Sequence, residues 1–155
     1  MIIYRTAVAP QWIDYNGHLR DAYYALIISY ATDAMMDLLG MDAAYRERTG
    51  CTLYTVEMHM HFLREVRQTD TLTVTLRLIG ADHKRLHVAL ELRVEGQTDA
   101  AASAELMLLH VQQGATSAAA SFEAPIRSAI DALEQASAAL PAKAPGSRQM
   151  QLRPR

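Results

Sequence analysis

The chain has 155 residues, of which 50% are hydrophobic and 21% charged, the balance of an ordinary globular protein. A formal net charge of −2 gives no reason to expect nucleic acid or an acidic membrane surface as a partner. The single cysteine, Cys51, excludes an intrachain disulfide and favours a reducing compartment. The N-terminal residues lack a secretory pattern, and no apolar stretch is long enough to cross a bilayer, so we expect a cytoplasmic protein.

The first part of the chain predicts one strand and one long helix. Residues 2–9 have the pattern of a strand that is stopped by Pro10, and a polar, turn-rich segment follows at Asp14–His18. From Asp21 to about Leu39 the pattern is helical, with Gly40 as the C-terminal cap. Apolar residues lie nearly all round this helix, which indicates that it is buried on most sides.

After a short helix predicted at Asp42–Arg48, the periodicity changes to two and indicates four consecutive strands. Their short connections predict a meander of antiparallel strands. The last strand, Ala101–Val111, is apolar on both faces near its end and is expected to be covered on both sides. Alternate apolar residues give each of the first three strands a core face: Tyr54, Val56, Met58, Met60 and Phe62; Leu72, Val74, Leu76 and Leu78; Leu86, Val88, Leu90, Leu92 and Val94.

Together these elements predict an α+β fold in which a curved antiparallel sheet wraps around one long central helix. Residues 1–140 form a single domain in this interpretation, with a surface helix at Pro125–Ala139. From Pro141 the composition is rich in proline, alanine and serine, and residues 141–155 are predicted to be a disordered tail.

The polar segment before the long helix carries the candidate chemistry. Within five residues it combines the carboxylate of Asp14, the amide of Asn16, Gly17 and the imidazole of His18. Asn-Gly tolerates positive φ angles, so the chain can turn sharply there. The turn leads into a helix N-terminus, where unpaired N–H groups and the helix dipole favour a developing negative charge. Acyl transfer needs this combination of a base or nucleophile with a site that stabilises the tetrahedral oxygen.

A strand, Asp14-x-x-Gly17-His18, a long buried helix and four antiparallel strands resemble the hotdog-fold acyl-CoA thioesterases of the 4-hydroxybenzoyl-CoA thioesterase type, from about Ile3 to Val111. The resemblance implies that Asp14 attacks the thioester or activates a water, and that amides around Arg20–Tyr24 bind the thioester oxygen. It also implies a homo-oligomer, a dimer or a dimer of dimers, whose sheets join edge to edge. No cofactor is implied, because coenzyme A is part of the substrate.

Three stretches are similar to one subgroup of this family, the betainyl-CoA thioesterases of carnitine breakdown. They are Asp14-Tyr15-Asn16-Gly17-His18, Tyr54-Thr55-Val56-Glu57-x-His59 and Ala104-Glu105-x-Met107-Leu108-Leu109-His110-Val111. The subgroup implies a small cationic acyl group, and a trimethylammonium group is held by aromatic faces because it cannot donate a hydrogen bond. The expected substrate-binding residues are Trp12, Tyr15, Gly17, Tyr23, Tyr24, Tyr54, Glu57 and His59.

Several of these residues also have a purely structural interpretation. Asp14 could cap the helix or bind a turn amide, and Asn16 could simply form the turn. His18 is either a second catalytic group or a residue that orders the Asp14 loop. Glu57 and His59 lie on the polar face of their strand, where a solvated surface is the default interpretation.

Two other functions are compatible with the same fold. Hotdog-fold enoyl-CoA hydratases resemble Asp-x-Asn-Pro-x-His, but here the aspartate and histidine are four residues apart and Gly17 replaces the proline. A non-catalytic acyl-CoA-binding protein is the second alternative, and a thioesterase assay would exclude it. No metal site is expected, because His59-x-His61 offers two imidazoles without a third ligand in register.

Overall fold

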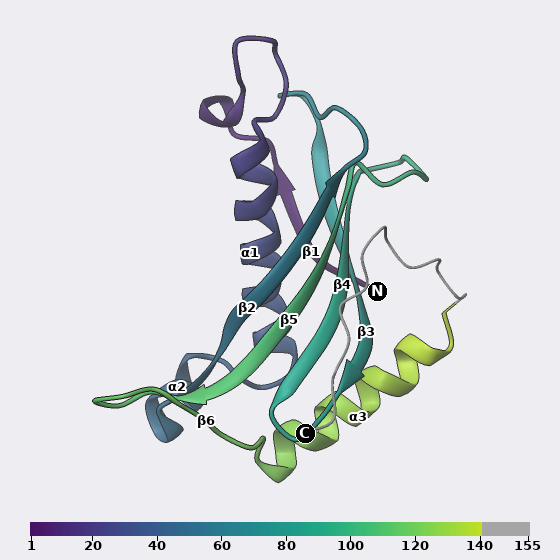
Figure 1. Ribbon diagram of the computed structural model, residues 1–155. Helices are drawn as coiled ribbons and strands as arrows, with labels where there is room; N and C mark the ends of the chain where they lie inside the picture. The colour runs from purple at the N-terminus through teal and green to yellow at the C-terminus, as the bar shows by residue number, and fades with distance from the viewer. Residues whose placement is uncertain (141–155) are drawn as a thin grey trace. The chain divides into compact units, whose positions relative to one another are not determined.

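The computed structural model describes residues 1–140, which form helices and one antiparallel sheet (Figure 1). The three predicted helices are confirmed, with no end displaced by more than one residue. The predicted tail, residues 141–155, lies outside the described residues. In chain order the elements are β1 Ile2–Ala7, the 3-10 helix η1 Pro10–Trp12, α1 Asp21–Leu38, α2 Ala43–Thr49, β2 Cys51–Phe62, β3 Thr71–Ala81, β4 Arg85–Val94, β5 Ala102–Gln112, β6 Ala118–Ala119 and α3 Ala124–Ala138.

The order of strands in the sheet is β1-β3-β4-β5-β2, and the short β6 pairs with the end of β5. β1 runs antiparallel to β3, with Thr6 opposite Leu72. The predicted meander is therefore wrong at one step, because β2 lies beside β5 rather than beside β3. Residues 63–70 carry the chain from one edge of the sheet to β3. Local periodicity identifies strands but contains no information about which distant strand each one pairs with.

The described chain divides into two compact units, and β2, β3, β4 and β5 contribute to both. The first unit contains residues 1–35, 60–76 and 90–104, and so includes β1, most of α1 and the Asp14 segment. The second contains residues 36–59, 77–89 and the described residues from 105 onward, including α2 and α3.

In the first unit, α1 buries one broad face rather than most of its sides. Six of its 18 residues are buried and Tyr30 is 41% exposed, so the prediction that it is buried on most sides is wrong. The ring of Tyr24 packs edge-on against Phe62, with centroids 5.3 Å apart, which ties the start of α1 to the end of β2. The buried residues recur at helical spacing: Tyr24, Ile27, Ile28, Ala31, Thr32 and Met35.

In the second unit, the fully buried His110 joins three segments. Its Nδ1 lies 2.8 Å from the carbonyl oxygen of Ala120, and its Nε2 lies 2.9 Å from the hydroxyl of Tyr45. A carbonyl can only accept, so Nδ1 carries the hydrogen and Nε2 accepts from Tyr45. The ring also packs against Phe122, with centroids 4.8 Å apart. His110 thereby links β5, α2 and the segment after β6.

α3 binds the edge of β3 beyond the part that pairs with β1. Its buried side consists of Ile126, Ile130, Leu133 and Ser137. The Ser137 hydroxyl accepts a hydrogen bond from the backbone N–H of Leu78 in β3 at 2.9 Å. β1 pairs with β3 only as far as Thr75, so α3 satisfies an edge group that β1 does not reach. None of the described helices is long and apolar enough to cross a membrane.

The apolar face of β2 is not buried, contrary to the prediction. Four of its large apolar residues are between 39% and 56% exposed: Tyr54, Val56, Met58 and Phe62. β2 ends the strand order, so within residues 1–140 its neighbour in the sheet is β5 alone. An edge strand with exposed apolar side chains is a surface for association.

Candidate active site

The Asp14 segment is a tight turn that its own carboxylate helps to close. The backbone N–H of Asp14 donates to the carbonyl of His18 at 2.8 Å, and that of Gly17 donates to the carbonyl of Asp14 at 3.1 Å. The Oδ1 atom of Asp14 accepts from the N–H of Asn16 at 2.8 Å and from the N–H of His18 at 3.2 Å. Gly17 has a φ of 82°, a conformation that strains residues with a side chain. The Asn-Gly signal therefore predicted this turn correctly.

The environment of Asp14 keeps its carboxylate ionised. The hydrogen bond from the His18 N–H is the largest influence and lowers the pKa of Asp14, while partial burial opposes it. The Asn16 N–H, the imidazolium form of His18 and the charge of Arg20 lower the pKa of Asp14 further, so the net shift is below the ordinary value. Both N–H groups bind Oδ1, and Oδ2 has no hydrogen-bond partner among the described residues. A carboxylate with one free oxygen can attack a carbonyl carbon or take a proton from water.

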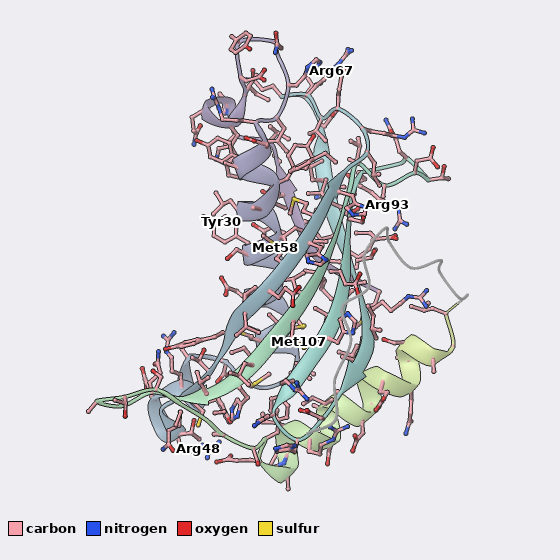
Figure 2. All side chains as sticks on the ribbon, in the orientation of Figure 1. Tyr30, Arg48, Met58, Arg67, Arg93 and Met107 are labelled. Atoms are coloured by element: carbon pink, nitrogen blue, oxygen red, sulfur yellow. The ribbon has the colours of Figure 1, made fainter. Side chains whose placement is uncertain are left out.

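Backbone pairing with the β2–β3 connection holds this turn in place. Ile13 pairs with Leu19 in an antiparallel bridge, and His18 pairs in the same way with Arg67, which Figure 2 labels. The N–H of Leu19 donates to the carbonyl of Val66 at 2.8 Å. Leu19 and Val66 are 5% and 0% exposed, so the side chains of the two residues joined by this hydrogen bond are buried. The turn is therefore anchored to a segment about fifty residues away in the sequence.

The amides predicted to bind the thioester oxygen are mostly occupied. The N–H of Arg20 donates to the Trp12 carbonyl at 2.9 Å, and that of Tyr23 donates to the Arg20 carbonyl at 3.0 Å. The N–H of Ala22 donates to the Asp21 carboxylate at 2.8 Å. The backbone N–H of Asp21, at the first position of α1, has no partner among the described residues. This amide is free to bind a substrate oxygen.

Of the predicted aromatic residues, the structure brings Trp12 and Tyr23 together. Their rings stack with centroids 5.6 Å apart and an interplanar angle of 21°. Tyr24 is buried, which raises its pKa, and its hydroxyl donates to the carbonyl of Arg64 at 3.2 Å. Tyr15 is 93% exposed and makes no ring contact among the described residues. The aromatic surface beside the turn is therefore the Trp12–Tyr23 pair.

Three predicted substrate-binding residues belong to the second unit, whereas Asp14 belongs to the first. The hydroxyl of Tyr54 accepts from Gln113 Nε2 at 3.1 Å, and hydrogen bonds from Gln113 and Ser117 lower the pKa of Tyr54. Glu57 Oε1 lies 3.1 Å from His59 Nε2, and His59 Nδ1 is buried without a hydrogen-bond partner in the described chain. Their grouping with Asp14 stays a prediction. No cluster of three or more His, Cys, Asp or Glu within residues 1–140 could hold a metal ion.

One neighbour of the turn was missed from the sequence. Glu65 Oε2 lies 3.0 Å from His18 Nε2, and both residues belong to the first unit. In the sequence Glu65 is one charged residue in a polar connection, and no local pattern distinguishes it. Only the backbone bridge between His18 and Arg67 brings its carboxylate to the imidazole.

Comparison with known proteins identifies the family. The Thioesterase-like superfamily model matches residues 8–136. The betainyl-CoA thioesterase of Pseudomonas aeruginosa is 45% identical over 138 residues, which are 89% of this chain and 86% of that protein. An Agrobacterium fabrum L-carnitine dehydrogenase/betainyl-CoA thioesterase is 46% identical over 102 residues, 64% of this chain and 20% of that longer protein.

A solved structure supports the same assignment. A Staphylococcus aureus protein in complex with CoA superposes with a TM-score of 0.86 at 27% identity, and the match covers 98% of this chain and 96% of that one. The predicted hotdog fold and the predicted similarity to betainyl-CoA thioesterases are both confirmed. The chain therefore belongs to the thioesterase-like superfamily and is a thioester hydrolase with the hotdog fold.

Proposed function

We propose that this thioester hydrolase cleaves acyl-CoA substrates, prefers betainyl-CoA, and uses the carboxylate of Asp14 for the chemistry. The observation that carries the proposal is the 45% identity to a betainyl-CoA thioesterase across 89% of the chain. The Staphylococcus aureus structure with bound CoA supports a CoA ester as the substrate. The Agrobacterium fabrum relative, which is named for L-carnitine dehydrogenase as well, supports a place in carnitine breakdown.

In this proposal Oδ2 of Asp14 is the reacting oxygen. The lowered pKa of Asp14 keeps its carboxylate ionised near neutral pH. An ionised carboxylate oxygen can attack the thioester carbonyl directly, and this is the step we assign to it. The attack forms a mixed anhydride and expels the coenzyme A thiolate, which leaves without strong help from a general acid. Water then hydrolyses the anhydride, releasing the carboxylic acid and restoring Asp14.

The negative charge that develops on the thioester oxygen needs a hydrogen-bond donor to stabilise it. The free N–H of Asp21 supplies one at the start of α1, where the helix dipole also favours negative charge. Asp14 and this amide are held on either side of the residue 18–20 segment, which the bridges to residues 66–67 fix in place.

The Trp12–Tyr23 pair is the aromatic surface that we assign to the trimethylammonium group. Trp12 ends η1, before the Asp14 segment, and Tyr23 lies in the first turn of α1, after that segment. A quaternary ammonium gains about 0.5–2 kcal/mol from an aromatic face, depending on how far it is desolvated. An uncharged group of the same shape does not gain this electrostatic attraction.

The test compares betainyl-CoA with 3,3-dimethylbutanoyl-CoA, which replaces the cationic nitrogen by carbon. With thiol release as the readout, we expect kcat/KM to favour the cationic ester by roughly 2- to 30-fold. Tyr23→Leu should abolish this preference. Tyr30→Leu, which changes an exposed tyrosine on the same helix, should retain it. Equal kcat/KM for both esters would reject betainyl selectivity, and an absence of turnover with every CoA ester would reject the acyl-CoA function itself.

A further inference from the structure

The side chains of His18 and Glu65 lie within hydrogen-bond distance beside the Asp14 turn, with Nε2 of the imidazole 3.0 Å from Oε2 of the carboxylate. We propose that Glu65 is a positioning residue, which fixes the His18 ring so that its Nδ1 acts as the base for the water that hydrolyses the acyl–Asp14 anhydride. This inference rests on the proposed thioesterase function.

The hydrogen bond to Glu65 determines which imidazole nitrogen can act as a base. An ionised carboxylate can only accept, so the hydrogen lies on Nε2 of His18. A neutral imidazole with its hydrogen on Nε2 has its free electron pair on Nδ1. No other side chain within residues 1–140 hydrogen-bonds the His18 ring. Glu65 is therefore the group that selects the tautomer, as the buried carboxylate of a catalytic triad does for its histidine.

The backbone places both partners firmly although their side chains are partly exposed. His18 is joined to Asp14 by two backbone-mediated hydrogen bonds and to Arg67 by a bridge, and Glu65 precedes Arg67 by two residues. The side chains of His18 and Glu65 are 30% and 68% exposed, so the pair adds little to the stability of the fold. Removing Glu65 should therefore affect the reaction far more than folding.

The assigned step balances without any further reactant. Water transfers a proton to His18 Nδ1 while its oxygen bonds to the acyl carbon of the anhydride. The bond between that carbon and the Asp14 oxygen breaks, which releases the carboxylic acid and the Asp14 carboxylate. The imidazolium then returns its proton to the coenzyme A thiolate. The sum is one thioester and one water converted into one acid and one thiol.

The test is a double-mutant cycle on the full chain with a CoA thioester as substrate. Glu65→Gln should lower kcat by about 10- to 100-fold and leave KM unchanged, an effect of the size seen when a metal-ligating histidine loses its hydrogen-bond partner. Glu65→Asp, which keeps an acceptor, should recover part of the rate. In a His18→Ala background, Glu65→Gln should not lower kcat further, because Glu65 acts through His18. Nitrogen-15 NMR should show His18 as the Nε2–H tautomer in the wild type and a changed tautomer population in Glu65→Gln.

Glu95→Gln is the matched control, because it is the same substitution in the same unit on a carboxylate that binds Arg5 at 2.7 Å. It should leave kcat unchanged. A Glu65→Gln rate equal to that of Glu95→Gln would overturn the inference, and so would an equal loss in the His18→Ala background. Either result with an active wild type rejects only the positioning role. A wild type that hydrolyses no CoA ester rejects the proposed function instead.

Discussion

At the scale of single residues, the two oxygens of the Asp14 carboxylate are suited to the two roles that the sequence presented as alternatives. Its Oδ1 accepts the N–H groups of Asn16 and His18, which is the structural role of a residue that closes a turn. Its Oδ2 remains without a partner among the described residues and is available to a substrate. Because the same two hydrogen bonds lower the pKa of Asp14, the turn also favours the ionised form that the proposed chemistry needs.

Asp14→Asn separates these two roles. The asparagine carbonyl oxygen can still accept both backbone hydrogen bonds, so the turn and the melting temperature should be preserved. Turnover should fall by about 10²- to 10⁴-fold, because an amide can neither attack the thioester nor take a proton. Steady-state kinetics and thermal unfolding check the two expectations together. Asp14→Asn with wild-type kcat would show that another group carries the reaction.

At the scale of elements, the turn between β3 and β4 also depends on one carboxylate. Asp82 Oδ1 accepts from the N–H groups of Lys84 and Arg85 at 2.9 and 2.7 Å, and Oδ2 accepts from Arg85 Nε at 2.8 Å. Burial alone would raise the pKa of Asp82, but these hydrogen bonds and the Arg85 charge outweigh it and lower the pKa. The turn occupies residues 82–84, between the end of β3 at Ala81 and the start of β4 at Arg85.

The lowered pKa of Asp82 predicts how the contribution of this turn to the free energy of unfolding depends on pH. A depressed folded pKa means that the folded state binds its proton less readily than the unfolded chain does. The stabilisation is complete above the ordinary aspartate pKa of about 3.9 and is lost as pH falls through the lower folded value. Asp82→Asn should reduce the free energy of unfolding by about 1 kcal/mol at pH 7, and by progressively less below about pH 4.

Urea unfolding of wild type and Asp82→Asn at a series of pH values measures this difference. Asp33→Asn, on an exposed position of α1, controls for the loss of a surface carboxylate. A difference that stays constant from pH 7 down to pH 3 would contradict the assignment to the ionised Asp82.

At the scale of the whole molecule, β2 is the strand whose outer edge has no partner in the described part of the chain. It ends the sheet, and exposed Val56 and Met58 lie along it (Figure 2 labels Met58). An unpaired strand edge with apolar side chains associates readily with a second edge. The family resemblance implies a dimer or a dimer of dimers joined in this way, and self-association through β2 is our prediction for this chain.

Analytical ultracentrifugation over a range of concentrations tests the prediction. The wild type should sediment as a dimer or larger, and Met58→Lys should shift it toward the monomer, because a charge placed at the interface must lose its hydration. Ile79→Lys changes another exposed apolar residue, 48% exposed on β3, and should leave the oligomer intact. A wild type that remains monomeric at every concentration would exclude this association.

Contacts between distant segments account for what the sequence did not reveal. His87 alternates along β4 with the core residues Leu86 and Val88, yet it is 4% exposed and its Nε2 lies 2.7 Å from Glu105 Oε1 on β5. The pairing of β2 with β5, the contact of Glu65 with His18 and the burial of His110 arise in the same way. Each depends on strand order or on a bridge between segments far apart in the chain.

The sequence by itself determined the helices, the strands, the Asn-Gly turn that presents Asp14 and the family of the fold. These features depend on residue periodicity, turn chemistry and short motifs, which act over a few neighbouring residues. Only the tertiary structure decided the strand order, the free oxygen of Asp14, the available Asp21 amide and the partner of His18. Those depend on which backbone groups of remote segments satisfy one another, and side-chain spacing along the chain does not encode that choice.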